Sequence, residues 1–509
     1  MSFKPSFLDR AWLAIAPQSG LRRLHARAVA SQLMRAYDGA SRDRRLGGWI
    51  ATGNSANAEL FGSNERVRNR ARDLERNNRV VFSAISQFSG QVVGTGITPR
   101  AVDPRKTVRQ AANDAWARFV DTCDPEGQLD YYGLQALAAR TMFRDGEVFR
   151  VWLKDESGVV NGRIVLREAD YLDQTRDILT GADAEKNLVV QGVEFDAYGR
   201  RAGYWMFPIH PGELGSIAIG GLLRGQSKRM PAEDVDHFYQ TLRPGQTRGV
   251  SWLAPSIVAL RGLDDVTEAM IWRKRIEACI GLMIRSPESQ GSVPIVGQQK
   301  TDARGRVEET MAPGKILRFG PGEEASTLDP STSGDTVDFV RSQLYAFSAT
   351  TGIPYHAITG DVSQANYSSL RAATLAGNVL LDAVQWLVFA QREKRAWRRV
   401  MQRESLLRNE PRLADVRCEF SMPVRPWVDP VKEITAKIME IRAGLQSQPD
   451  ALAERGLNWE QQLSEIEAFL KALDQPGIVL DTDPRRINHS GALQIAQAAQ
   501  GVSDGNSQT

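Results

Sequence analysis

Cysteine is scarce in this chain: only Cys123, Cys279 and Cys418 occur among its 509 residues. They are odd in number and far apart, so they form neither a disulfide framework nor a paired-cysteine zinc motif. This excludes the small secreted folds that depend on disulfides, and it fits a reducing cytoplasm.

Long hydrophobic runs are also lacking. The most apolar stretch, Val379–Ala390, is shorter than the roughly 20 residues of a membrane-spanning helix, and it contains Asp382. The apolar run Ala11–Ala16 is too short for the hydrophobic segment of a signal peptide. We therefore expect no membrane span and interpret the N-terminus as mature sequence.

Neither sign of charge is in large excess, because 64 Lys and Arg residues oppose 61 Asp and Glu residues. The net charge of +3 disfavours tight DNA wrapping, which draws its affinity from neutralising many phosphates. The charge is nevertheless segregated, since Glu410–Asp483 leans acidic and the first eighty residues are basic. We interpret the basic residues of this part as a solvent-facing or subunit-facing helix surface; they are Arg22, Arg23, Arg27, Arg35, Arg42, Arg44, Arg45, Arg66, Arg68, Arg70, Arg72, Arg76 and Arg79.

Catalytic and metal-binding motifs are missing as well. The sequence contains no GxxxxGK[ST] nucleotide loop and no HExxH pair. Asp264 and Asp265 are adjacent on an expected helix and therefore point in different directions, which disfavours a working carboxylate pair. We predict no catalytic residue, no metal site and no cofactor, and we interpret every histidine as structural, namely His25, His210, His237, His356 and His489.

The ordinary globular content, 42% hydrophobic and 25% charged residues, is enough for a large core. Helical spacing of apolar residues predicts helices over Asn64–Ser89 and Thr107–Thr122. From Glu147 the pattern changes to β-forming residues separated by turn signals. It predicts an antiparallel section with strands at Val148–Lys154, Arg163–Arg167, Leu188–Asp196 and Ala202–Phe207.

The second half of the chain is mainly helical in pattern. After Pro255 a helix is expected to about Ile284, residues 286–334 predict a small β-containing insertion, and Asp335–Thr350 predicts another helix. A single pattern over Ser368–Arg403 predicts one helix of roughly 54 Å, with a bend at Gly377-Asn378. The remaining expected elements are helices at Val431–Leu445 and Trp459–Leu473 and a disordered polar tail.

Three segments, in this order and spacing, resemble the portal proteins of tailed bacteriophages, in their lambda-type branch; gene transfer agents use similar portals. Shorter stretches at Val92–Ile97 and Glu194–Arg200 extend the resemblance over most of the chain, although Ser251 replaces an expected proline and residues after about 430 match poorly. The segments are Asp236–Tyr239 leading to Arg243–Pro255, Pro313–Leu317 with Pro321–Glu324, and Gly352–Tyr355 through Asp361–Arg371.

The resemblance implies an α+β ring subunit, typically in a ring of twelve, with wing, two-helix stem, clip, long kinked helix and helical crown. Residues 1–250 would form the N-terminal arm and wing. The remaining divisions would be 251–285 first stem helix, 286–334 clip, 335–351 second stem helix, 352–367 tunnel loop, 368–430 long helix and return to the wing, 431–483 crown, and 484–509 disordered tail.

The same resemblance implies a channel for packaging and ejecting double-stranded DNA at one capsid vertex, with assembly in the host cytoplasm. The partners would be the large terminase, head-completion or adaptor proteins, and the major capsid and scaffold proteins, with no membrane. The residues facing DNA would be Thr359, Asp361, Ser363, Gln364, Asn366 and Tyr367. The clip residues docking terminase or adaptor would be Lys300, Arg304, Arg306, Glu308 and Glu309.

Two other classes of protein remain open from the residues alone. One is a nucleic-acid-processing enzyme whose site is dispersed in the sequence, because catalytic groups are defined by geometry and not by spacing. The other is a bacterial structural adaptor unconnected with DNA. The mass of the assembly distinguishes these from a ring subunit.

Overall fold

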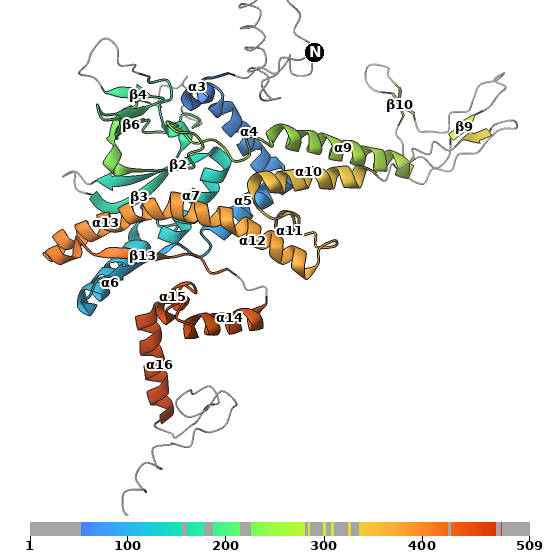
Figure 1. Ribbon diagram of the computed structural model, residues 1–509. Helices are drawn as coiled ribbons and strands as arrows, with labels where there is room; N and C mark the ends of the chain where they lie inside the picture. Colours follow the sequence, from blue (N-terminus) through green and yellow to red (C-terminus); the bar gives the residue numbers. More distant parts are fainter. Residues whose placement is uncertain are drawn as a thin grey trace, which may run out of the picture. The chain divides into compact units, whose positions relative to one another are not determined.

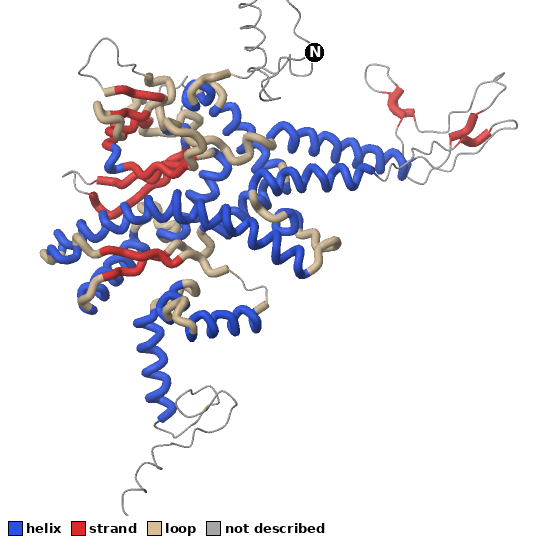
Figure 2. Tube along the Cα trace, viewed as in Figure 1, coloured by secondary structure: helices blue, strands red, loops and turns tan. Residues whose placement is uncertain are grey.

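The structure, a computed structural model, describes residues 52–154, 160–177, 187–213, 225–279, 283–285, 299–301, 307–309, 324–326, 335–425, 429–474 and 480. In these ranges, helices pack on antiparallel sheets (Figures 1 and 2). The fold is therefore mixed α+β, as the sequence predicts. The arm before residue 52 and the tail after residue 480 lie outside the described residues.

The first helical stretch is two helices, α4 (Asn64–Asn77) and α5 (Arg79–Val92), preceded by the short α3 (Ala56–Leu60). The prediction of one continuous helix is wrong at Asn78. This residue has an extended backbone, and its side-chain oxygen accepts hydrogen bonds from the N–H groups of Val80 and Val81. Such a bond satisfies donors that the first turn of a helix leaves unpaired, so Asn78 begins a new helix.

Two helices follow, α6 (Lys106–Thr122), which the sequence predicts, and α7 (Tyr131–Asp145), which it does not. Both ends of α7 have ordinary signals. The side chain of Asp130 accepts a hydrogen bond from Gly133 N, and Gly146 ends the helix at a φ of 92°, which favours glycine. The helix leads directly into the central sheet.

The central sheet has the antiparallel order β3–β2–β8. On β2, Val148 and Trp152 belong to clusters with the helices, whereas Phe149 and Val151 belong to a cluster with the second sheet. The alternation follows from the two-residue period of a strand. The strands are β2 (Glu147–Lys154), β3 (Val160–Glu168) and β8 (Val235–Tyr239).

The second sheet has the antiparallel order β4–β5–β6–β7. The single strand predicted over Leu188–Asp196 is a tight hairpin, because Gln191 and Gly192 both adopt positive φ, 48° and 81°. The strands are β4 (Leu188–Val190), β5 (Val193–Phe195), β6 (Arg201–Met206) and β7 (Lys228–Pro231).

A helical hairpin and a group of short strands follow. Helix α9 (Ile257–Cys279) lies beside α10 (Asp335–Thr351) (Figure 1). The prediction that the first helix reaches Ile284 is wrong, because Met283–Arg285 is strand β9 and pairs with β12 (Glu324–Ser326). Strands β10 (Gln299–Thr301) and β11 (Val307–Glu309) form a second pair, which confirms β-structure in the insertion.

The long helix consists of α12 (Tyr367–Val384), the π-helical turn η5 (Gln385–Phe389) and α13 (Ala390–Leu407). The break in the α-helical pattern lies at η5, whereas α12 continues through Gly377, where the sequence predicts a bend. An 18-residue window of this run has a mean hydropathy of 1.4, apolar enough by composition and length to cross a membrane. Part of the run is buried: Leu381, Val384, Val388 and Phe389 belong to the core.

Gly377 is needed for packing. A Cβ atom on Gly377 would lie 2.9 Å from Gly352 O, whereas one on Gly262 in α9 would meet nothing within 4 Å. We expect Gly377→Ala to lower the free energy of unfolding by about 1 kcal/mol or more because of overpacking, and Gly262→Ala to raise it by up to ~1 kcal/mol through helix propensity. Urea unfolding of the two variants checks the opposite signs; equal stabilisation would contradict this packing role.

The chain then returns to the helical layer, and three further helices follow among the described residues. Strand β13 (Arg417–Ser421) pairs antiparallel with β1 (Thr98–Val102), which precedes α6. Beyond it lie α14 (Pro430–Arg442), α15 (Gln448–Ala453) and α16 (Trp459–Asp474), and none of the three has a buried side chain. Two of them match expected helices, and α15 is additional.

Candidate nucleic-acid interface

The α9–α10 hairpin is attached to the core at one end. Ile257, Leu260 and Leu263 on α9 and Phe347 on α10 are buried. Farther along α9, Ile271 and Trp272 are about half exposed. The two helices therefore extend from the core with apolar side chains that the described residues leave partly uncovered.

The segment after α10 is more ordered than the loop over 352–367 that the resemblance implies. It contains helix α11 (Tyr355–Thr359), whose Ile358 is buried in the same core as Phe347. Ser83 Oγ donates a hydrogen bond of 2.7 Å to Ile358 O. Gly360 then ends the helix with a φ of 74°. The core thus fixes the start of the loop that leads to α12.

Asp361 is the charged centre of this loop. Its carboxylate accepts hydrogen bonds from Ser363 Oγ at 2.6 Å, Ser363 N at 3.0 Å and Tyr355 Oη at 3.0 Å. These bonds lower the pKa of Asp361, with a smaller contribution from the guanidinium of Arg341 at 4.0 Å. Asp361 therefore stays ionised and orders the turn.

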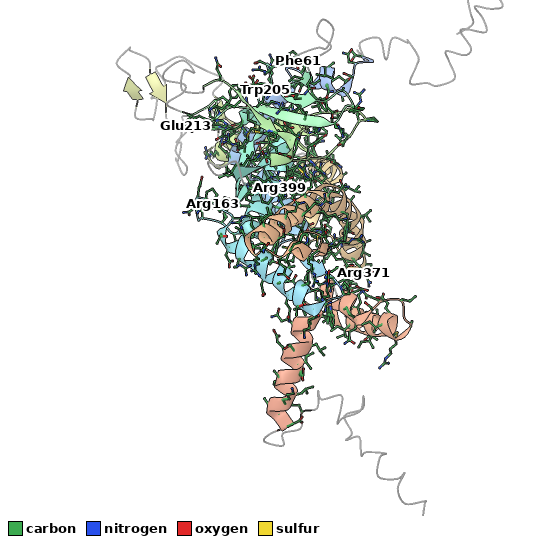
Figure 3. The ribbon with its side chains drawn as sticks, turned by 90° about the vertical axis from the view of Figure 1, so that its left-hand side faces the viewer. Phe61, Arg163, Trp205, Glu213, Arg371 and Arg399 are labelled. Carbon is green, nitrogen blue, oxygen red and sulfur yellow. The ribbon has the colours of Figure 1, made fainter. Side chains whose placement is uncertain are left out.

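Two of the other candidate loop residues fix the backbone at the ends of the loop. Thr359 and Asn366 make local bonds: Thr359 Oγ1 donates to Tyr355 O, and Asn366 caps α12 in a reciprocal pair with Ser369. Ser363, Gln364 and Tyr367 are exposed. The first cation after the loop, Arg371, is also exposed on α12 (Figure 3). The structure thus presents short polar side chains and one aromatic ring to the outside.

The candidate clip residues are only partly visible. Lys300 in β10 is the register partner of Glu308 in β11, and Glu309 is the partner of Gln299. Arg304 and Arg306 lie outside the described residues.

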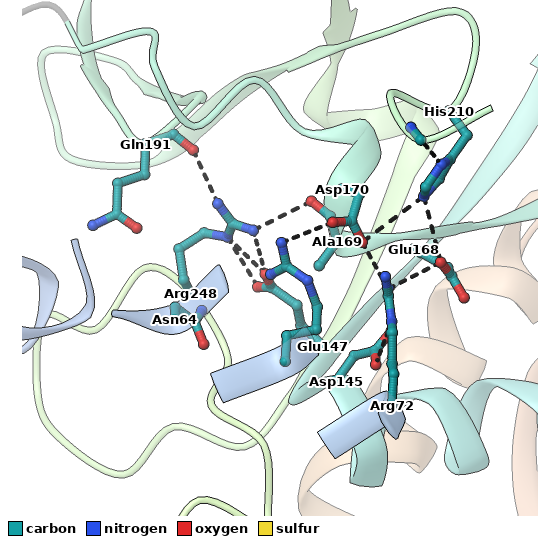
Figure 4. A network of polar contacts seen from close by, with 12 residues as sticks. Asn64, Arg72, Asp145, Glu147, Glu168, Ala169, Asp170, Gln191, His210 and Arg248 are labelled. Atoms are coloured by element: carbon teal, nitrogen blue, oxygen red, sulfur yellow. Dashed lines mark hydrogen bonds and ion pairs between the residues drawn. The ribbon is translucent and has the colours of Figure 1, made fainter. Parts of the chain in front are cut away.

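Two arginines of α4 correct the prediction of a solvent-facing basic surface, whereas Arg66, Arg70 and Arg76 of the same helix are exposed as predicted. Arg68 is 1% exposed and bonds to Asp170 at 3.0 Å. Arg72 lies among three carboxylates, with its Nη2 2.6 Å from both Asp145 and Asp170 and 2.9 Å from Glu168 (Figure 4). Part of the basic charge of the first eighty residues is therefore neutralised within the fold.

His210 lies beside this cluster. Its position there is not evident from the spacing of these residues in the sequence. Its Nε2 is 3.6 Å from Glu168 Oε2 and 4.0 Å from Asp170 Oδ2, so these three side chains are close enough to share an ion. The guanidinium of Arg72 already contacts both carboxylates, however, and supplies the positive charge that a metal would. The donor set does not fit a cation site.

A second polar cluster lies inside the central sheet, where Glu147 and Arg248 are both fully buried (Figure 4). Glu147 also accepts hydrogen bonds from Gly249 N at 2.9 Å and from His237 Nε2 at 2.9 Å. Arg201 donates to His237 Nδ1 at 2.6 Å, and because arginine is only a donor, the proton of the neutral ring lies on Nε2. This confirms the structural interpretation for His237.

Burial lowers the pKa of His237 to about 3, because it disfavours the charged form of the ring. The hydrogen bond to Glu147 raises the pKa and only partly offsets the effect of burial, whereas the positive charges of Arg201 and Arg248 lower it further. The unfolded chain therefore binds a proton below pH 6.5 that the folded chain does not. We expect this residue to reduce the free energy of unfolding by up to roughly 1.4 kcal/mol per pH unit as the pH falls from 6.5 toward 3. Urea unfolding at pH 7, 6 and 5 should show a weaker pH dependence in His237→Gln; an unchanged slope would contradict the assignment.

Comparison with known proteins identifies similar chains. The family model described as "Phage portal protein, lambda family" matches residues 42–385. The probable portal protein of Halomonas phage phiHAP-1 is 22% identical over 493 residues, covering 92% of each chain. Portal protein B of Escherichia phage lambda is 21% identical over 478 residues, covering 82% of this chain and 85% of the relative.

Solved structures of gene transfer agent particles also align with the chain. A chain from the neck of an empty particle has a TM-score of 0.46 and 16% identity, covering 81% of this chain and 96% of that one. A chain from a native virion has a TM-score of 0.42 over the same shares, also at 16% identity.

Proposed function

The chain belongs to the lambda family of phage portal proteins, and on that premise we propose that it forms a ring at one capsid vertex through which double-stranded DNA passes. As a phage portal protein it is a structural, non-enzymatic component of the virion at the portal vertex, and it acts in DNA packaging. The observation that carries the proposal is the family match over residues 42–385.

We propose that the ring contains twelve subunits whose α9–α10 hairpins stand side by side. Exposed apolar residues on both helices, among them Trp272 and Phe339, support this because a neighbouring subunit would cover them. Twelve helices of about 10 Å diameter in a circle leave a lumen of roughly 28 Å. Duplex DNA fits such a lumen closely.

The proposed layout follows the divisions that the resemblance implies. Residues 1–250 form the arm and wing, 335–351 the second stem helix, 352–367 the tunnel loop and 431–483 the crown. The first stem helix ends at Cys279 and not at residue 285, so the clip includes β9 and runs from about residue 280 to 334.

The loop between α11 and α12 is the segment proposed to face DNA. A channel that lets DNA slide should avoid many simultaneous contacts from Lys or Arg to phosphate, which give tight and salt-sensitive binding. The loop fits this requirement, because Asp361 is ionised and engaged within it, and the exposed Ser363 and Gln364 offer short polar contacts. Thr359 and Asn366 hold the loop's shape in this proposal, and Tyr367 lines its rim.

The clip is proposed to dock the large terminase during packaging and head-completion or adaptor proteins afterwards, through Lys300, Arg304, Arg306, Glu308 and Glu309. Major capsid and scaffold proteins are the proposed partners of the wing. The packaging motor would be a separate chain.

The mass and image of the purified assembly test the ring. We expect native mass spectrometry and electron microscopy to show closed rings with a central channel, alone or with capsid and scaffold partners. A chain that stays monomeric under all these conditions would contradict the proposal.

A further inference from the structure

The last helices carry apolar seams that the described chain leaves exposed or only partly covers. On α14, Val431, Ile434, Ile438, Ile441 and Leu445 follow a strict alternation of three and four residues. Leu445 lies just beyond the helix end, and the exposed fractions of Val431 and Leu445 are 75% and 81%. This spacing is that of the a and d positions of a coiled coil. We call these five residues the α14 seam.

Helix α16 has the same pattern. Trp459, Leu463, Ile466, Leu470 and Leu473 alternate by four and three residues, and we call them the α16 seam. Leu463 and Ile466 are 57% and 45% exposed, and no side chain of the helix is buried. Isolated helices of this length are marginal in water, so both seams need a partner.

Polar contacts tie each of the two helices to another part of the chain. Lys437 ties α14 to the following segment through Gln446 at 2.9 Å and Glu454 at 2.8 Å. Arg109 of α6 pairs with Glu460 in the first turn of α16. The helices α14 and α16 run in different directions on either side of α15 (Figure 1).

The charges beside the seams are complementary. At the positions that flank a and d, α14 has Lys437 and Arg442, whereas α16 has Glu460, Glu467 and Asp474. Lys437, Glu460 and Glu467 also pair within the chain, with Glu454, Arg109 and Lys471. Flanking charges select the partner in coiled coils, since like charges repel. Two copies of α14 would bring cations together, and two copies of α16 would bring carboxylates together.

We propose that the α14 seam of one subunit packs against the α16 seam of a second copy of this chain. The contact joins two different surfaces, so it is heterologous and continues from subunit to subunit until a ring closes. It lies outside residues 42–385, the range of the family match. The proposal deepens the proposed function, because it rests on the ring and names a partner surface within it.

Disulfide trapping in the full chain tests this pairing. Ile438→Cys and Ile466→Cys are made in separate chains that differ in mass by a tag, both in a Cys279→Ser background. Burial raises the pKa of the Cys123 and Cys418 thiols to about 12, so these react slowly. The matched control is Ala436→Cys, an exposed position on the opposite face of α14.

We expect oxidation of mixed rings to join Ile438→Cys chains to Ile466→Cys chains at least tenfold more than either joins Ala436→Cys chains. A chain with both Ile438→Cys and Ile466→Cys should give a ladder of multimers. Rings without this cross-link, or a cross-link confined to one chain, would overturn the pairing while the proposed function stands. If no ring forms at all, the proposed function fails, and this pairing fails with it.

Discussion

Deleting Val362–Ala365 from the loop between α11 and α12 should abolish DNA packaging while rings still form. The deletion removes the exposed tip, including Ser363 and Gln364, that is proposed to face DNA. It keeps Asp361, bonded to Tyr355 at 3.0 Å, and Asn366, which caps α12. The flanking helices therefore keep their hydrogen bonds, and the expected defect is one of DNA movement.

Packaged DNA per particle and ring images from the same preparation measure this effect. We expect DNA to fall to the level of particles that lack a portal, with rings unchanged in mass. The matched control is Tyr198→Ala, which alters an exposed turn between β5 and β6 and should package normally. Normal packaging by the deletion variant would contradict the proposal that this loop faces DNA in the channel.

A double variant separates contact from spacing. Ser363→Ala with Gln364→Ala keeps the loop length and the bond from the backbone N–H of residue 363 to Asp361, and it removes the two polar side chains. If the loop acts by touching DNA, this variant should reduce the rate of packaging. If the deletion abolishes packaging and the double substitution leaves it unchanged, the length of the loop is what packaging requires, and its polar side chains are not needed.

The elements predicted from the sequence are those with strong local patterns. β2 and α6 lie within one residue of expectation, and α10 extends one residue further. Helix α7 was missed although its signals, Asp130 before it and Gly146 after it, are local. Asn78 is likewise a local capping signal within a stretch that otherwise reads as one helix. Capping residues therefore mark helix boundaries that the periodicity of apolar residues does not.

Other features could not be predicted, because they depend on residues far apart in the chain. Glu147 and Arg248 are 101 positions apart, and β1 pairs with β13 across more than 300 residues. Gly377 seemed to mark a bend, but its role is visible only when Gly352 is placed against it. For the loop, the ordered motifs predicted the family correctly, and the roles of the individual residues stay predictions.

Replacing Arg248 by methionine should produce the largest loss of stability among the single substitutions considered. It would leave the fully buried carboxylate of Glu147 with only His237 and Gly249 N as partners. Removing one member of a buried ion pair costs about 3–5 kcal/mol, because the remaining charge is uncompensated. We expect urea unfolding of Arg248→Met to show a loss of this size.

The double variant Glu147→Gln with Arg248→Met separates loss of charge balance from loss of packing. It removes both charges, so it should be more stable than Arg248→Met alone. Arg243→Met is the matched control nearby, since Arg243 pairs with Glu59 at 2.7 Å while both side chains are exposed, and such pairs contribute at most about 1 kcal/mol. If Arg248→Met lowered the free energy of unfolding no more than Arg243→Met does, the prediction would be contradicted. The buried pair of Glu147 and Arg248 would then not be the contact that holds the Gly249 segment, and the start of α9 after it, against the central sheet.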